Sequence, residues 1–165
     1  MHSGIRALSF SFAVVAAAGA VTAAQAATYY TTRIEILVAA PIARMWDYLS
    51  DFCSFVNQGG QFSTCTTGSG GVGSIRLSAD GTQDLVVAAG PFNYAFERIA
   101  GPLAEADYHF ALHLEEIDPL QSRIVVTLIW DEDGIPEAQR DLIRLREVQG
   151  LEGPLQDAKL VAEAS

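Results

Sequence analysis

Apolar and polar residues alternate along most of the chain after residue 30, and this pattern predicts β-strands. In residues 32–39, Ile34, Ile36 and Val38 alternate with Arg33, Glu35 and Leu37, as in a half-buried strand. Further strand-like runs cover residues 61–67, 71–79, 82–89, 92–100, 106–117 and 122–133. Seven strands are therefore expected, six of them consecutive.

Turn signals separate several of these runs. Asp80-Gly81 joins residues 71–79 to residues 82–89 and is a strong signal for a tight hairpin. Asp118-Pro119 predicts a turn between the last two runs. These signals favour strands that pair with their neighbours in the sequence.

Helical periodicity occurs on both sides of the six consecutive strands. Pro41 suits the first turn of a helix, and an apolar stripe follows at Ile42, Met45, Trp46 and Leu49. From Pro136 onward, a longer helical pattern carries apolar residues on roughly one side: Leu142, Leu145, Val148, Leu151 and Leu155. Because Gly150, Gly153 and Pro154 fall inside it, we expect a kink or a break there.

This order of elements is of the α+β class. We expect a curved, seven-stranded antiparallel sheet wrapped around a long C-terminal helix, with short helical structure after the first strand. A sheet that wraps a helix without closing fully leaves a space between them, where apolar ligands bind.

The N-terminus has the pattern of a secretory signal peptide. Arg6 precedes an uncharged apolar run that ends in Ala24-Gln25-Ala26, a small-residue cleavage site. The alternative is a membrane anchor, since residues 7–27 are about long enough to span a bilayer. We expect cleavage before Ala27, a single domain over residues 27–165, and a periplasmic or secreted protein.

The acidic composition excludes some partners. The chain has a formal net charge of −10 at pH 7, and binding to nucleic acid phosphates needs a basic face. Anionic membrane surfaces are unfavourable partners for the same reason. We therefore expect no nucleic acid partner and no stable membrane insertion after signal cleavage, while the oligomeric state is left open.

Cys53 and Cys65 are the only cysteines. In an oxidising compartment two cysteines of a secreted domain more often pair than stay free. Their spacing is not that of a redox or zinc motif. A disulfide between them is the favoured interpretation, with two buried thiols or a catalytic thiol as the alternatives.

Several segments together resemble the START-like helix-grip superfamily (SRPBCC), and within it the polyketide cyclase/dehydrase and lipid-transport group. They are "PIARMWDYLSDF", "GVGSIR", "YAFERIAGPLAEADYHFALHLEE" and "SRIVVTLIWD". The resemblance covers about residues 32–160 and implies the helix-grip fold. It does not specify the function, because one fold hosts transporters, sensors, cyclases and binding proteins.

The resemblance also implies that Arg76 lies on the concave side of the sheet. Many relatives carry a glutamate on the next strand that pairs with such an arginine, and the corresponding position here is Gln83. An inward Arg76 would then lack a partner and favour an anionic ligand group. The alternative is a surface arginine on a strand whose other face, Ile75 and Leu77, packs inward.

Aromatic residues form the second set of candidates for a ligand site. Tyr94 and Phe96 share one face of their strand, and Tyr108, Phe110 and Leu112 share one face of the next. They either line a ligand cavity or simply fill the core, and both faces of residues 122–133 are too apolar to decide which points inward. The full set of candidate ligand-binding residues is Arg76, Leu85, Tyr94, Phe96, Tyr108, Phe110, Leu112 and Trp130.

Metal sites and catalytic motifs are not supported by the sequence. His109 and His113 lie on a predicted strand, where four residues span about 13 Å, too far apart for ligands that each lie about 2.1 Å from one zinc ion. We place them on the convex face. The turn Asp131 to Gly134 lacks the further spaced oxygens of a calcium loop, and no serine lies in a nucleophile-elbow sequence.

We therefore predict an exported protein that binds a hydrophobic lipid-like or polyketide-like molecule between sheet and terminal helix, with no cofactor and no metal. One alternative is an enzyme of the cyclase/dehydratase type, in which Arg76 or Tyr108 would polarise a carbonyl. Another is a structural or interaction module with a filled core. Binding ranks first because no acid–base pair is visible, and the sequence leaves open whether any catalysis occurs.

Overall fold

The structure is a computed structural model that describes residues 26–54 and 63–164. The predicted signal peptide, residues 1–26, lies outside the described residues except for Ala26. Residues 61 and 62 of the second predicted strand also lie outside them.

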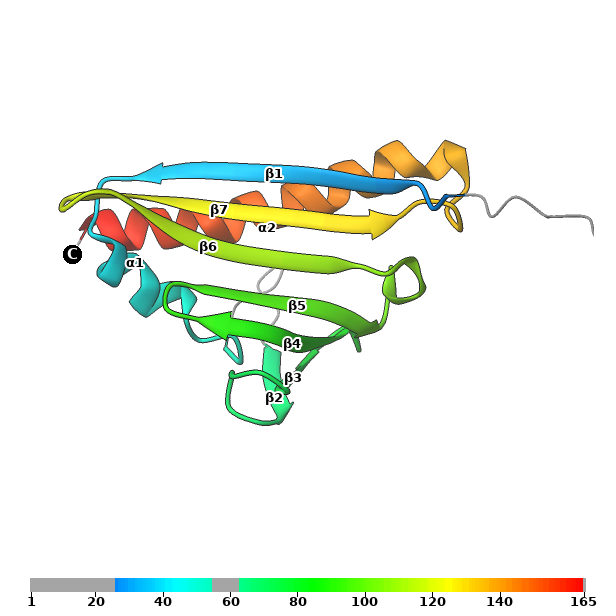
Figure 1. Cartoon of the computed structure of the whole chain (residues 1–165), viewed down its shortest axis with the longest axis horizontal. Helices are drawn as coiled ribbons and strands as arrows, with labels where there is room; N and C mark the ends of the chain where they lie inside the picture. The colour runs from blue at the N-terminus through cyan, green and yellow to red at the C-terminus, as the bar shows by residue number, and fades with distance from the viewer. Residues whose placement is uncertain (1–25, 55–62, 165) are drawn as a thin grey trace, which may run out of the picture.

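The described strands form one antiparallel sheet in the order β1-β7-β6-β5-β4-β3-β2 (Figure 1). Each strand from β2 to β7 pairs with its sequence neighbour, whereas β1 pairs with β7. The prediction of a seven-stranded antiparallel sheet is confirmed. The strands are β1 (Tyr29–Val38), β2 (Ser63–Thr67), β3 (Ile75–Ser78), β4 (Gln83–Gly90), β5 (Asn93–Ala100), β6 (His109–Asp118) and β7 (Gln121–Asp131).

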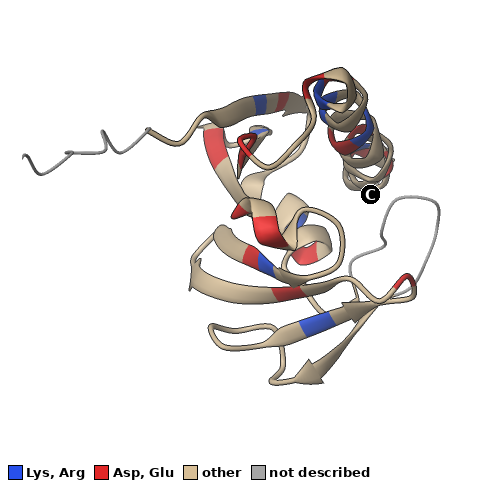
Figure 2. Ribbon diagram, turned by 90° about the vertical axis from the view of Figure 1, so that its right-hand side faces the viewer, with Lys and Arg blue, Asp and Glu red and all other residues tan. Residues whose placement is uncertain are grey.

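Three helical segments complete the described part of the chain: α1 (Ile42–Leu49), the 3₁₀ turn η1 (Ala104–Ala106) and α2 (Glu137–Ala164). Pro41 precedes the first turn of α1 as predicted, and Met45 and Leu49 are its buried residues. In Figure 2, α2 is seen nearly end-on beside the curved sheet. The predicted fold class, a curved sheet with a long C-terminal helix and a short helix after the first strand, is confirmed.

The terminal helix differs from the prediction in two ways. α2 continues through Pro154 without a break, because packing of its buried residues outweighs the cost of an internal proline, about 3 kcal/mol. The predicted apolar stripe is also wrong, since Leu142 and Leu145 are 69% and 53% exposed. The buried residues of α2 are instead Glu147, Leu155, Ala158 and Ala162.

Both ends of α2 are attached to the rest of the molecule. Near its start, Arg144 forms an ion pair with the buried Glu132, just after β7. Near its end, the Ala39 backbone N–H donates a hydrogen bond to Glu163 Oε1 at 2.8 Å, and α1 packs against α2. The middle of α2 therefore spans the sheet between two fixed points.

The structure decides the inward register of β7, which the sequence left open. Ile124, Val126, Leu128 and Trp130 all belong to the hydrophobic core cluster and are fully buried. Val125, on the opposite face, is also fully buried. It lies between Glu35 of β1 and His113 of β6 in the strand register, so neighbours on the outer face cover it.

Candidate ligand pocket

Four aromatic rings gather on the concave side of β5 and β6. Tyr94 and Phe96 come from β5, Phe110 comes from β6, and Tyr108 directly precedes β6. Phe96 and Phe110 are opposite each other in the register and their rings stack with centroids 4.5 Å apart. Tyr94 stacks on Phe110 at 6.0 Å. These residues form an aromatic wall that is almost entirely buried.

Charged residues continue the same face of the sheet onto β3 and β4. Arg76, Asp84 and Arg98 are opposite one another on β3, β4 and β5. Asp84 accepts from Arg76 Nη2 at 2.8 Å through one oxygen and from Arg98 Nε at 3.2 Å through the other. The Arg76 and Asp84 side chains are only 4% and 3% exposed. Pairing of this kind is what makes burial of the charges tolerable.

The middle of α2 adds a carboxylate to this network. Glu147, whose side chain is 6% exposed, lies 3.7 Å from Arg98 Nη1 through Oε2, and its Oε1 lies 3.2 Å from Arg146 Nη2. The guanidinium carbon of Arg98 also lies over the Tyr108 ring, 4.1 Å from its centroid. An ionic chain therefore connects β3, β4 and β5 to the terminal helix.

A cavity of about 240 Å³ lies between this face of the sheet and α2. Its walls are the aromatic residues, the ionic chain and the middle of α2. The lining residues are Arg76, Ser78, Asp80, Thr82, Asp84, Tyr94, Phe96, Arg98, Pro102, Tyr108, Phe110, Arg146, Glu147, Gly150, Leu151 and Pro154.

The two lining tyrosines are hydrogen-bond donors at neutral pH. Burial raises the pKa of Tyr94 to about 12. Burial also raises the pKa of Tyr108 well above its ordinary value of 10.0, and Glu147 adds to this effect by its charge and a hydrogen bond. Both hydroxyls therefore keep their protons, and neither is a base at physiological pH.

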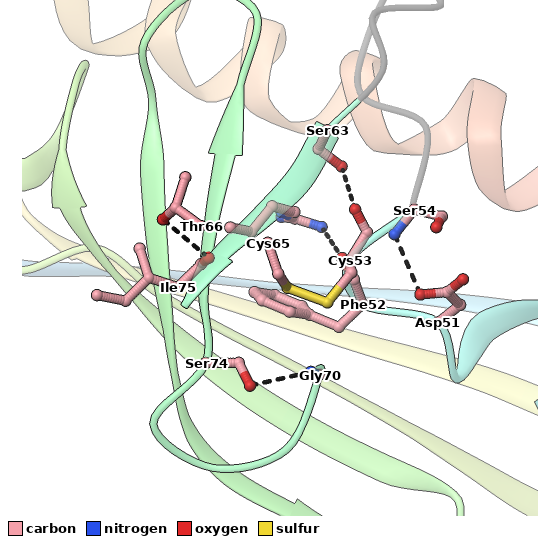
Figure 3. The surroundings of a disulfide bond; sticks show 11 residues. Asp51, Phe52, Cys53, Ser54, Ser63, Cys65, Thr66, Gly70, Ser74 and Ile75 are labelled. Atoms are coloured by element: carbon pink, nitrogen blue, oxygen red, sulfur yellow. Dashed lines mark hydrogen bonds between the residues drawn. A yellow bond between two sulfur atoms is a disulfide. The ribbon is translucent and has the colours of Figure 1, made fainter. Parts of the chain in front are cut away.

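The predicted disulfide is present, and it supports one wall of the pocket (Figure 3). It joins Cys53, just after α1, to Cys65 of β2, with Cα atoms 4.9 Å apart. Phe52, the residue before Cys53, accepts a hydrogen bond from Arg76 Nη1 at 3.3 Å through its carbonyl oxygen. Its ring centroid lies 4.4 Å from the Arg76 guanidinium carbon. The disulfide thus fixes the segment that contacts Arg76.

Comparison with known proteins identifies the fold. No protein-family model and no curated protein sequence matches the chain. The crystal structure of Ara h 8.0201 matches with a TM-score of 0.65 at 16% identity, over 84% of this chain and 100% of that one. A protein from Nitrosospira multiformis matches with a TM-score of 0.63 at 17% identity, over 79% and 96%. A solution structure from Thermobifida fusca gives 0.64 at 20%, over 78% and 92%.

This is a START-like helix-grip fold. The resemblance inferred from the sequence segments is confirmed at the level of the fold. At 16–20% identity, the likeness shows the fold alone. The function must therefore be argued from the pocket.

The helix-grip sheet places Arg76 on its concave side, as the resemblance implied, but the expected lack of a partner is wrong. Asp84, not Gln83, is opposite Arg76 in the register and forms the ion pair. Gln83 is opposite Leu77 and points to the other face. The reason for expecting an anionic ligand group, an unpaired arginine, is therefore removed.

The eight candidate ligand-binding residues divide into two groups. Five of them line the cavity: Arg76, Tyr94, Phe96, Tyr108 and Phe110. Leu112 and Trp130 are buried in the helix-grip core and do not line it, and the Trp130 ring stacks on Tyr108 at 6.0 Å. Leu85 lies on the opposite face of β4 from Asp84 and is partly exposed.

His109 and His113 lie on β6, as the alternating pattern predicted. Their side chains are 39% and 44% exposed, on the opposite face from Phe110 and Leu112. His109 pairs with Asp107 at 2.9 Å, and His113 pairs with Glu115 at 3.1 Å.

Other features bear on metals and membranes. In the turn after β7, the Asp133 backbone N–H donates to the Asp131 carboxylate at 2.9 Å. Across residues 26–54 and 63–164, no cluster of three or more His, Cys, Asp or Glu is arranged to hold a metal ion. None of the described helices has the length and apolar character needed to cross a membrane.

Among the lining residues of this helix-grip pocket that sequence reasoning missed are the three that form the ionic chain with Arg76: Asp84, Arg98 and Glu147. Two of them had a signal in the strand pattern, because Arg98 follows Phe96 by two residues and Asp84 precedes the buried Val86 by two. Glu147 lies at helical spacing from Leu151 and Leu155. A charged residue on an otherwise buried face was the available clue in all three cases.

Proposed function

We propose that this chain is an exported protein that binds a small hydrophobic molecule in the pocket between the sheet and α2. The observation that carries the proposal is that four buried aromatic rings border a cavity between the sheet and α2. Opposite them, α2 presents Gly150 and Pro154, which leave room for a guest. Small-molecule sites combine apolar walls with convergent polar groups, and this lining has four aromatic and six charged side chains.

The size of the cavity limits the proposed ligand. At about 240 Å³, the cavity lies below the range of about 300–1,000 Å³ that is typical of pockets for drug-sized ligands. A compact aromatic or alicyclic body fits this volume better than a long acyl chain. The ligand we propose is therefore a compact hydrophobic molecule, such as a small polyketide-like ring compound.

Native mass spectrometry of the protein purified from its own source tests the proposal. We expect an additional organic mass that is retained under native conditions and lost on denaturation. The variant Gly150→Leu, which places a side chain at the cavity wall, should fold and lose this mass. Gly153→Leu is the matched control, because Gly153 does not line the cavity and has no atom within 4 Å of an added Cβ.

Two results would count against binding as the function. One is a purified protein that carries no organic mass and binds no member of a panel of compact aromatic compounds. The other is equal ligand retention by Gly150→Leu and Gly153→Leu, which would place the bound mass outside this cavity.

Export is the second part of the proposal. The Cys53–Cys65 disulfide supports an oxidising compartment, and the signal-peptide pattern of residues 1–26 supports secretion. We expect the mature protein to begin at Ala27 and residues 27–165 to form one domain. Intact-mass measurement of the exported protein checks the N-terminus, and a mass that includes residues 1–26 would contradict cleavage.

A further inference from the structure

The charges around the pocket are balanced. Its lining contains three cationic and three anionic side chains. Asp84 neutralises Arg76 and contacts Arg98, while Glu147 contacts Arg98 and Arg146. The remaining anion, Asp80, is at the hairpin, where its carboxylate accepts from the Thr82 backbone N–H at 2.9 Å. Each of the three arginines of the lining therefore already has a carboxylate partner.

This balance disfavours a charged ligand. A carboxylate in the cavity would add an uncompensated negative charge to a site whose cations already have carboxylate partners. It would also enter a protein of net charge −10. Burial of an unpaired charge is strongly unfavourable, whereas burial of a neutral polar group costs little once it is hydrogen-bonded.

One polar group in the aromatic wall is available to a ligand. Tyr94 lines the cavity and is 4% exposed, and burial keeps its hydroxyl protonated, with no side-chain hydrogen bond contributing to its pKa. In the described part of the chain, the fully buried polar side-chain atoms without a hydrogen-bond partner are Arg76 Nε and Trp130 Nε1. The Tyr94 hydroxyl does not belong to this group. Because Tyr94 lines the cavity, its hydroxyl is a candidate donor to a ligand.

Arg76 offers less to a ligand than its position suggests. The Arg76 Nε lacks a hydrogen-bond partner, but this atom is fully buried. The guanidinium carbon lies 4.4 Å from the Phe52 centroid and 5.1 Å from the Phe96 centroid, so the group is enclosed by two rings. Its other nitrogens already donate to Phe52 and Asp84. Tyr94 is therefore the better candidate to contact a ligand.

Building on the proposed function, we propose that the ligand is uncharged and carries one acceptor oxygen, such as a ketone or ester carbonyl. The Tyr94 hydroxyl donates a hydrogen bond to this oxygen, and the apolar body lies against Phe96 and Phe110. The ionic chain from Arg76 to Glu147 holds α2 over the sheet and receives no charge from the ligand.

Three probe compounds with equal numbers of non-hydrogen atoms separate the effect of an acceptor oxygen from the effect of a negative charge. Acetophenone is neutral with an acceptor oxygen, cumene is neutral without one, and benzoate is an anion of similar shape. At pH 7 we expect acetophenone to bind about tenfold more tightly than cumene, because cumene leaves the Tyr94 hydroxyl without a partner. We expect benzoate to bind at least tenfold more weakly than acetophenone. Isothermal titration calorimetry measures all three affinities.

Two conservative variants test the groups behind these preferences. Tyr94→Phe keeps the ring and removes the hydroxyl, so acetophenone and cumene should bind about equally. Tyr48→Phe, at an exposed tyrosine of α1, should leave the ratio of the two affinities unchanged.

Glu147→Gln removes one pocket anion and should raise the affinity for benzoate about tenfold relative to acetophenone. Glu152→Gln, at an exposed residue of α2, is its control.

The outcomes distinguish this inference from the proposed function. If benzoate binds most tightly, or acetophenone and cumene bind equally to the unmodified protein, the pocket binds ligands but the inference is wrong. If the preference for acetophenone persists in Tyr94→Phe, the assignment of the donor is wrong. If none of the three compounds binds, both the inference and the proposed function fail.

Discussion

The two halves of α2 meet the same sheet in different ways. In the C-terminal half, Leu155, Ala158 and Ala162 are buried in one apolar cluster with Met45 and Leu49 of α1. In the middle of the helix, the residues that line the cavity are Arg146, Glu147, Gly150, Leu151 and Pro154. The C-terminal half of α2 is thus part of the solid core, whereas its middle encloses a cavity.

This difference shows how a single sheet and helix can form both a core and a pocket. Leucine and alanine fill space without directional requirements, so they pack densely. A buried carboxylate such as Glu147 must instead form an ion pair with a cation in a suitable geometry. Arg98 of β5 provides this cation, with its Nη1 atom 3.7 Å from Glu147 Oε2. The ionic chain thus joins the middle of α2 to the sheet beside the cavity.

The largest expected effect comes from breaking the ionic chain. Asp84→Ala leaves Arg76 without its ion-pair partner and removes one partner of Arg98. We expect a loss of about 3–5 kcal/mol in the free energy of unfolding, measured by chemical denaturation. Asp157→Ala, at an exposed position of α2, should change it by less than about 0.5 kcal/mol. Similar free energies of unfolding for the two variants would show that the ionic chain does not stabilise the fold.

The solid half of α2 is tested by Leu155→Ala. Leu155 is fully buried, so its truncation should lower the free energy of unfolding by about 2–5 kcal/mol. Since Leu155 does not line the cavity, the affinity of acetophenone should change little. Leu160→Ala, on the same helix but 62% exposed, is the matched control. A strong loss of ligand affinity in a folded Leu155→Ala protein would show that the C-terminal half of α2 also contributes to the pocket, which contradicts the proposed division of the helix.

Removal of the disulfide should lower the free energy of unfolding by as much as Leu155→Ala does, or by less. Replacing both Cys53 and Cys65 by serine opens a loop of sequence separation 12, and we expect a loss of about 3 kcal/mol in the free energy of unfolding. Because Phe52 contacts Arg76, ligand affinity should fall as well. Denaturation of the oxidised protein and the double variant measures the first effect, and calorimetry measures the second. Unchanged affinity would show that the disulfide does not support the pocket.

The smallest effect is a dependence of stability on alkaline pH. The pKa of Tyr94 is raised from 10.0 to about 12 in the folded protein, so the unfolded chain loses this proton first. Stability from this group is present below pH 10 and is lost as the pH rises toward 12, by about 1 kcal/mol per pH unit. Tyr94→Phe should show a correspondingly shallower decline in the free energy of unfolding between pH 10 and pH 12, and an unchanged decline would contradict this assignment.

Much of the fold could be predicted from the sequence because local signals and packing agree. The alternating pattern identified the strands, and Asp80-Gly81 identified the β3–β4 hairpin, where Gly81 has a φ of +88° that suits glycine. The terminal helix was less predictable. Leu142 and Leu145 suggested a buried stripe, but attachment of both helix ends turned that side outward.

The site was only partly predictable, because register decides which charges meet. The aromatic residues were found from alternation alone. Whether Arg76 faces Gln83 or Asp84 depends on the pairing of two short strands, and a shift of one residue exchanges the two faces. The contact between Arg98 and Glu147 joins residues from β5 and α2, and no local pattern encodes it.

Chemical-shift mapping of the folded, disulfide-bonded protein with a panel of compact aromatic compounds, including acetophenone, tests the existence of the ligand pocket most directly. We predict that the largest ligand-induced shifts occur at Phe96, Tyr108, Gly150 and Leu151, which line the cavity, while Leu155 and Ala162 change little. If no compound produces shifts at these four residues, or if the shifts lie on exposed apolar residues instead, this space is not a ligand site.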